Sequence, residues 1–344
     1  MTVTGEETMQ SDDAPLLAID ALNVEFRSRD GTLPVIRDLS MTVMPGETVG
    51  VVGESGCGKS MTALSIMRLV PTPPGRIRSG RIAFEGRNLL ALPEREMRQL
   101  RGSRIGMIFQ EPMTSLNPVF TIGNQIAEGI QLHEPVSDRE ALRRSIQALE
   151  QVGIPAPERR VHEYPHQLSG GMRQRVMIAM AIACKPALLI ADEPTTALDV
   201  TVQAQIFDLL KDVQRQLGTA IILITHDMGA IAEMADKVVV MYAGRAVESG
   251  PAREVLKAPR HPYTVGLIRC VPHLLEDPGE ERGLLEEIPG MVPSLRDIGA
   301  GCAFADRCPR VMDRCRRELP PGFAVAPDHA AACWLLEEEA EETA

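Results

Sequence analysis

The chain carries the stretch Gly53-Glu54-Ser55-Gly56-Cys57-Gly58-Lys59-Ser60, which reads G-x-x-x-x-G-K-S. An apolar run at residues 48–52 precedes it, and a helix-like run that begins with Met61 follows it. Glycines let backbone N–H groups turn inward around an oligophosphate, and the N-terminal end of the following helix attracts the same anion. In such a loop Lys59 reaches the β- and γ-phosphates, and the Ser60 hydroxyl binds Mg²⁺. This context makes a chance glycine turn the weaker interpretation.

The composition is that of an ordinary globular protein. Of the 344 residues 44% are hydrophobic and 24% are charged, and the net charge of −11 disfavours a nucleic-acid partner. The best apolar segment, at residues 176–190, is too short to span a bilayer. Residues 1–15 are polar and acidic without the apolar core of a secretory signal. We therefore expect a disordered lead on a cytosolic protein.

Three further apolar runs, at residues 104–110, 187–193 and 220–226, end at polar side chains. Open α/β sheets place ligands at the carboxyl ends of their strands, so one site is expected to collect these side chains. Gln110 could bind the metal and the attacking water. Asp192 can hold Mg²⁺ through water and Glu193 can act as general base, while His226 can bond the γ-phosphate and orient that base. For each side chain alone, a solvated strand end is the alternative.

Two other features are ambiguous on their own. Phe26 lies on a strand-like run at residues 16–26, where it either stacks on an adenine or fills the core. Ser169-Gly170-Gly171-Met172 begins a helix, either as an anion-binding turn or as a plain N-cap. Helical periodicity from residue 122 to residue 153 predicts a mostly helical insertion over residues 111–183.

Together these motifs resemble those of the ATP-binding cassette (ABC) ATPases, in order and spacing, across residues 16–256. Residues 53–60 resemble the Walker A loop, Gln110 the Q-loop and residues 168–172 the signature. Residues 188–193 resemble Walker B, residues 197–199, ending at Asp199, the D-loop, and His226 the H-loop. The resemblance implies an α/β P-loop NTPase (RecA-like) core with an antiparallel β-subdomain, an α-helical subdomain and a small cysteine-containing C-terminal extension.

Finer features resemble the ATPase subunits of bacterial oligopeptide and dipeptide importers, a group that includes nickel importers. They lie at residues 111–118, 195–203, 261–264 (His-Pro-Tyr-Thr) and 301–309. Two departures are Met172, where most cassettes have Gln, and Phe26, where many have Tyr. The resemblance implies an ATPase that powers peptide import. Nickel import is the alternative, and a soluble non-transport ABC ATPase is the remote one.

The family mechanism involves an assembly at the cytoplasmic face of the cell membrane. Two cassettes close head to tail around two ATP molecules, so each ATP meets one chain's P-loop and the other chain's Ser169-Gly170-Gly171. The resemblance favours a related but different second ATPase, and therefore a heterodimer over a homodimer. It also implies two permease subunits, gripped by the Q-loop and helical subdomain, and an extracellular solute-binding protein.

The predicted division is a lead at 1–15, an ATPase domain at 16–256 and an extension at 257–344 with an acidic tail. The extension contains four cysteines spaced C-x5-C-x6-C-x17-C: Cys302, Cys308, Cys315 and Cys333. Four thiolates suit a [4Fe–4S] cluster or zinc, and free thiols are the third possibility. The resemblance favours iron–sulfur. We expect the cluster to be a structural staple, because the extension has little apolar sequence from which to build a core.

Overall fold

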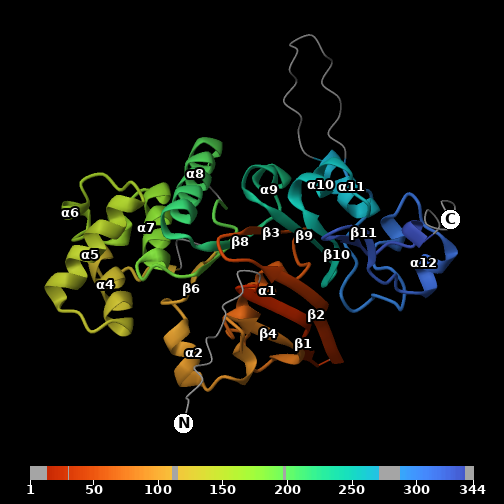
Figure 1. The fold of residues 1–344 in the computed structure, drawn as a ribbon, viewed down its shortest axis with the longest axis horizontal. Helices are drawn as coiled ribbons and strands as arrows, with labels where there is room; N and C mark the ends of the chain where they lie inside the picture. The colour runs from red at the N-terminus through yellow and green to blue at the C-terminus, as the bar shows by residue number, and fades with distance from the viewer. Residues whose placement is uncertain (1–13, 30, 111–114, 197–198, 271–286, 338–344) are drawn as a thin grey trace, which may run out of the picture.

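The computed structural model describes residues 14–29, 31–110, 115–196, 199–270 and 287–337 (Figure 1). The predicted disordered lead falls outside the described residues except for its last two, and so does the acidic tail from residue 338. Parts of two predicted motifs, residues 111–114 and 197–198, also lie outside them.

An eight-stranded sheet forms the centre of the molecule, in the order β11-β12-β10-β9-β3-β8-β7-β6. Strands β9, β3, β8, β7 and β6 are parallel, and their near-continuous burial is typical of a sheet covered on both faces. The register pairs Val52 with Thr225 and Asp192 with Ile224, so the predicted strand ends lie along one edge. The strands are β3 (Thr48–Val52), β6 (Ile105–Ile108), β7 (Leu188–Asp192), β8 (Ala220–Thr225), β9 (Lys237–Tyr242), β10 (Arg245–Pro251), β11 (Phe323–Ala326) and β12 (His329–Ala331).

A separate antiparallel sheet, in the order β2-β1-β4-β5, lies below the centre in Figure 1. Its strands are β1 (Leu17–Ser28), β2 (Gly31–Val43), β4 (Gly75–Phe84) and β5 (Arg87–Asn88). Its apolar face shares one core with the main sheet, in which Leu22 and Ile36 join Val51 and Ile222. The antiparallel β-subdomain is therefore confirmed.

A layer of helices covers one end of the main sheet (Figure 1) and forms the predicted α-helical subdomain. Side chains of Thr121, Ser137 and Ser169 accept hydrogen bonds from the first-turn amides of α4, α5 and α7, which fixes where these helices begin. These helices share a core with β7, in which Ile126 and Leu189 take part. The layer contains α4 (Ile122–His133), α5 (Asp138–Gln151), α6 (Pro157–Arg160) and α7 (Gly170–Ile182).

The remaining helices cover the sheets and connect them. They are α1 (Lys59–Ile66), α2 (Glu94–Leu100), α8 (Val200–Leu217), α9 (Met228–Met234), α10 (Ala252–Lys257), α11 (Pro262–Arg269) and α12 (Asp313–Arg317), with short 3-10 turns at Leu89–Ala91, Pro165–Gln167 and Ala305–Arg307. Within the described ranges, no helix has the length and apolar character needed to cross a membrane.

The C-terminal region is anchored to the main sheet by strand pairing and by aromatic packing. Strand β12 pairs with β10, and β11 pairs with β12. Phe304 is 2% exposed and lies 5.3 Å from the Tyr242 ring and 5.4 Å from the Tyr263 ring, between ring centres. Trp334 is also buried. Within residues 257–270 and 287–337, the expectation of little core is therefore wrong.

Candidate functional site

The glycine-rich loop connects β3 to α1 and encloses the Lys59 side chain. Gly56 and Gly58 adopt positive φ values of 80° and 105°, which glycine tolerates without strain. The Lys59 ammonium donates hydrogen bonds to the carbonyl oxygens of Gly53 at 2.6 Å and Glu54 at 3.1 Å. Only 5% of Lys59 is exposed. The loop therefore holds a buried cation at the N-terminal end of a helix, which is the electrostatic requirement for binding a polyphosphate.

Ser60 and Asp192 bring α1 and β7 together beside this loop. The Ser60 hydroxyl donates a hydrogen bond to Asp192 Oδ1 at 3.0 Å. Burial raises the pKa of the Asp192 carboxyl, although the bond from Ser60 acts in the opposite direction. Two oxygen ligands on rigid elements fit a hard divalent cation such as Mg²⁺.

Glu193 lies next to this pair and contacts three side chains from separate segments. Its carboxylate accepts hydrogen bonds from Gln110 Nε2 at 2.9 Å and from the Thr196 hydroxyl at 3.0 Å, and it lies 3.4 Å from His226 Nδ1. Its φ of 48° is a strained conformation that costs about 1–3 kcal/mol for a non-glycine residue and is concentrated at functional sites. Thr196 follows Glu193 by three residues in a turn and was not among the predicted site residues.

The other predicted site residues lie elsewhere. Ser169 caps α7, and its hydroxyl accepts from the Met172 amide at 3.3 Å. Figure 1 places α7 in the helical layer, apart from α1 at the centre. Asp199 caps α8 through the Val202 amide at 2.9 Å. Phe26 is half-buried on β1 and packs against the core of the antiparallel sheet.

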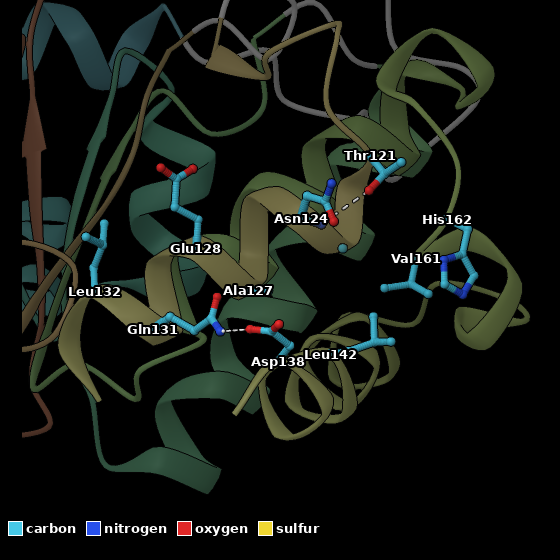
Figure 2. A pocket seen from close by; sticks show the side chains of 11 residues that line it. Thr121, Asn124, Ala127, Glu128, Gln131, Leu132, Asp138, Leu142, Val161 and His162 are labelled. Carbon is cyan, nitrogen blue, oxygen red and sulfur yellow. Dashed lines mark hydrogen bonds between the residues drawn. The ribbon is translucent and has the colours of Figure 1, made fainter. Parts of the chain in front are cut away.

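A groove of about 530 Å³ crosses the helical layer (Figure 2). Its walls come from α4, the start of α5 and the Val161–His162 segment. Leu132 lines it and is 74% exposed, and Val119 and Phe120, directly before α4, are 71% and 50% exposed. Polar side chains of Asn124, Gln131 and Asp138 also face the groove, where Gln131 donates to Asp138 at 2.7 Å. The surface therefore combines apolar and hydrogen-bonding groups, as protein interfaces do.

The prediction of an iron–sulfur cluster is wrong, because the described residues do not form a metal-binding group. Cys302, Cys308, Cys315 and Cys333 line one small cavity, but the described part of the chain contains no group of three or more side chains placed to hold a metal ion. Burial raises the pKa of Cys302 and of Cys333 to about 11, so in the absence of a metal both are neutral thiols. The same geometry gives zinc no support, and all four cysteines are free of disulfides.

Comparison with known proteins identifies the class. Residues 36–196 match the ABC transporter family. Residues 247–315 match the C-terminal region of oligopeptide/dipeptide transporters. The chain belongs to the ABC transporter family and to its branch of ATP-binding proteins that carry this C-terminal region.

Its relatives match over nearly their whole length. A probable peptide ABC transporter ATP-binding protein of Sinorhizobium fredii is 51% identical over 96% of this chain and 98% of its own. The oligopeptide transport ATP-binding protein OppD of Bacillus subtilis is 50% identical over 94% and 90%, and the dipeptide transport protein DppD of that organism is 46% identical over 95% and 96%.

Solved structures show the same fold. A dimeric ATP-binding cassette in a post-hydrolysis state, bound to ADP and Pi, superposes with a TM-score of 0.62 and 25% identity, over 69% of this chain and 99% of that one. The cbiO1 cassette of Clostridium perfringens gives 0.61 and 29%, over 72% and 92%. The fold class is thereby confirmed as a P-loop NTPase, and the chain is an ABC-type ATPase.

Proposed function

We propose that this chain is the ATP-binding and hydrolysing subunit of an importer for oligopeptides or dipeptides. Support comes from relatives at about 50% identity that are named for peptide transport and align over nearly the whole chain. The structural observation that supports this proposal most directly is that Gln110, Thr196 and His226 all contact the Glu193 carboxylate, beside the Lys59 loop.

Each polar group has a separate task in ATP hydrolysis. Lys59 and the loop amides bind the phosphates, and Phe26 stacks on the adenine. Ser60 and Asp192 would hold Mg²⁺, which when bound neutralises phosphate charge. Glu193 accepts a proton from the attacking water, and Gln110 and His226 orient the Glu193 carboxylate from either side. The Thr196 hydroxyl fixes the carboxylate rotamer.

The assembly supplies what one chain lacks. Ser169-Gly170-Gly171-Met172 starts α7, and the N-terminal end of a helix suits an anion such as the ATP of a facing cassette. A second, related ATPase subunit gives the heterodimer that we favour, with Asp199 near the shared interface.

The groove of the helical layer is the proposed docking surface for a short cytoplasmic helix of one permease subunit. Its exposed Leu132, with Val119 and Phe120 before α4, would pack on apolar side chains of that helix. Docking there would hold the chain at the cytoplasmic face of the membrane and couple cassette closure to the permease, which receives solute from an extracellular binding protein.

The test is uptake by vesicles that contain this subunit, its partner ATPase, both permeases and the binding protein. We expect ATP-dependent accumulation of labelled dipeptides and oligopeptides, lost with Lys59→Ala. Uptake of Ni²⁺ in place of peptides would contradict the peptide assignment. ATP hydrolysis that is indifferent to both solutes and to the permeases would contradict the transport role.

A further inference from the structure

We propose that Arg307 of the C-terminal region neutralises the Glu54 carboxylate and thereby sets the ATP affinity of the phosphate-binding loop. The inference rests on the assignment of residues 53–60 as that loop. It makes Arg307 a positioning residue, which acts on ATP through Glu54, and it gives the C-terminal region a role in nucleotide binding.

Glu54 is the second residue of the loop, and its carboxylate creates an electrostatic problem. A negative charge at a site for a polyphosphate repels the ligand. Arg307 resolves it by pairing with both oxygens of Glu54, with Nη1 at 2.6 Å from Oε2 and Nη2 at 2.9 Å from Oε1. Such a two-point pair is the strongest form that an arginine–carboxylate contact takes.

Hydrogen bonds hold the Arg307 guanidinium in this position. It also donates to the carbonyl oxygens of Pro289 at 3.0 Å and Ile288 at 3.2 Å, and to the Tyr242 hydroxyl at 3.3 Å. These contacts and the pair with Glu54 use all five N–H groups of an arginine. The Arg307 side chain is 5% exposed and the Glu54 side chain is 26% exposed, so the arginine is buried while the carboxylate lies partly in contact with water.

The backbone groups of Glu54 form two further hydrogen bonds, one with Lys59 and one with Tyr263 of α11. Its backbone N–H donates to the Tyr263 hydroxyl at 2.8 Å, and its carbonyl oxygen accepts from Lys59 at 3.1 Å. Tyr263 is fully buried. The C-terminal region therefore holds Glu54 at its side chain and its amide, while Lys59 holds its carbonyl.

The experiment measures KM for ATP and kcat in the assembled importer. Arg307→Gln leaves Glu54 unneutralised, so we expect KM to rise about tenfold, which is the effect of one unit charge at a separation of about 12 Å and an effective dielectric constant of about 20. The rise should exceed any change in kcat. It should shrink between about 0.05 and 0.5 M salt, because salt screens the uncovered charge.

The double variant Glu54→Gln/Arg307→Gln is the decisive comparison, since it removes the repelling carboxylate as well. We expect it to restore most of the lost affinity. Glu54→Gln alone leaves Arg307 as an uncompensated positive charge, so it should lower KM. Arg317→Gln, an exposed arginine ten residues along the same region, is the matched control and should leave KM unchanged.

A purely structural role for Arg307 predicts the opposite pattern. The double variant would then be as impaired as Arg307→Gln, with no salt dependence, and either result would overturn the proposal. If Arg307→Gln does not fold, a rise in KM for Glu54→Gln alone would overturn it equally. Lys59→Ala separates the two hypotheses: normal ATP binding by that variant would refute the loop assignment itself.

Discussion

Gly53→Ala should disable the nucleotide loop while leaving the fold intact. A Cβ atom at Gly53 would lie 2.2 Å from the Met241 carbonyl oxygen and 2.9 Å from Cys57 Sγ. Contacts of a Cβ below 3.0 Å are essentially never seen. The oxygen belongs to the backbone of the buried strand β9, so the loop itself must move, by about 1 Å. Displacements of that size cost about 100-fold in activity at a catalytic site.

The matched control is Gly56→Ala in the same loop. No heavy atom lies within 4 Å of the corresponding Cβ, so the only penalty is the φ of +80°, about 1–2 kcal/mol for an alanine. Nucleotide titration and ATPase assays of the assembled complex would compare both variants. We expect about 100-fold lower turnover for Gly53→Ala and a much smaller loss for Gly56→Ala. Equal activities would refute the steric argument.

Two further predictions concern the C-terminal region. Phe304→Ala removes a ring that is 2% exposed and lies between Tyr242 and Tyr263, so urea unfolding should show that the free energy of unfolding falls by about 3–5 kcal/mol. The control Leu319→Ala, at an exposed position, should lower it by about 0.5 kcal/mol or less. Equal losses in the two variants would contradict the role of Phe304 as an aromatic anchor. Burial raises the pKa of Cys302 and Cys333 to about 11, so iodoacetamide should label them slowly at pH 8 and faster as the pH approaches 11, whereas urea-unfolded protein should react readily at pH 8. Rapid labelling of both at pH 8 in the folded chain would contradict their neutral state.

The nucleotide site is encoded locally, which is why the sequence predicts so much of it. Gly53 to Ser60, Gln110, Asp192 and His226 each follow an apolar run, and parallel strands place such ends along one edge whatever the rest of the chain does. The apolar run at residues 220–226 is observed as β8 (Ala220–Thr225), with His226 directly after it.

The contacts of the C-terminal region could not be predicted in the same way. Strands β11 and β12 are short, and the pairing of β12 with β10 joins residues about 80 positions apart, for which no local periodicity exists. The pair of Arg307 with Glu54 spans 253 positions. The cysteine spacing indicated proximity, and the four residues do line one cavity, but spacing gives neither the orientation nor the ionisation of a thiol.

Glu193→Gln in the assembled complex, with the partner subunit's own site disabled, tests the central claim most directly. We predict that this variant binds ATP with near-normal affinity, is trapped as a closed dimer with its partner, and loses about 100- to 10,000-fold in turnover, the contribution of a general base. Full ATP turnover by the same complex would remove Glu193 from that role and contradict the account.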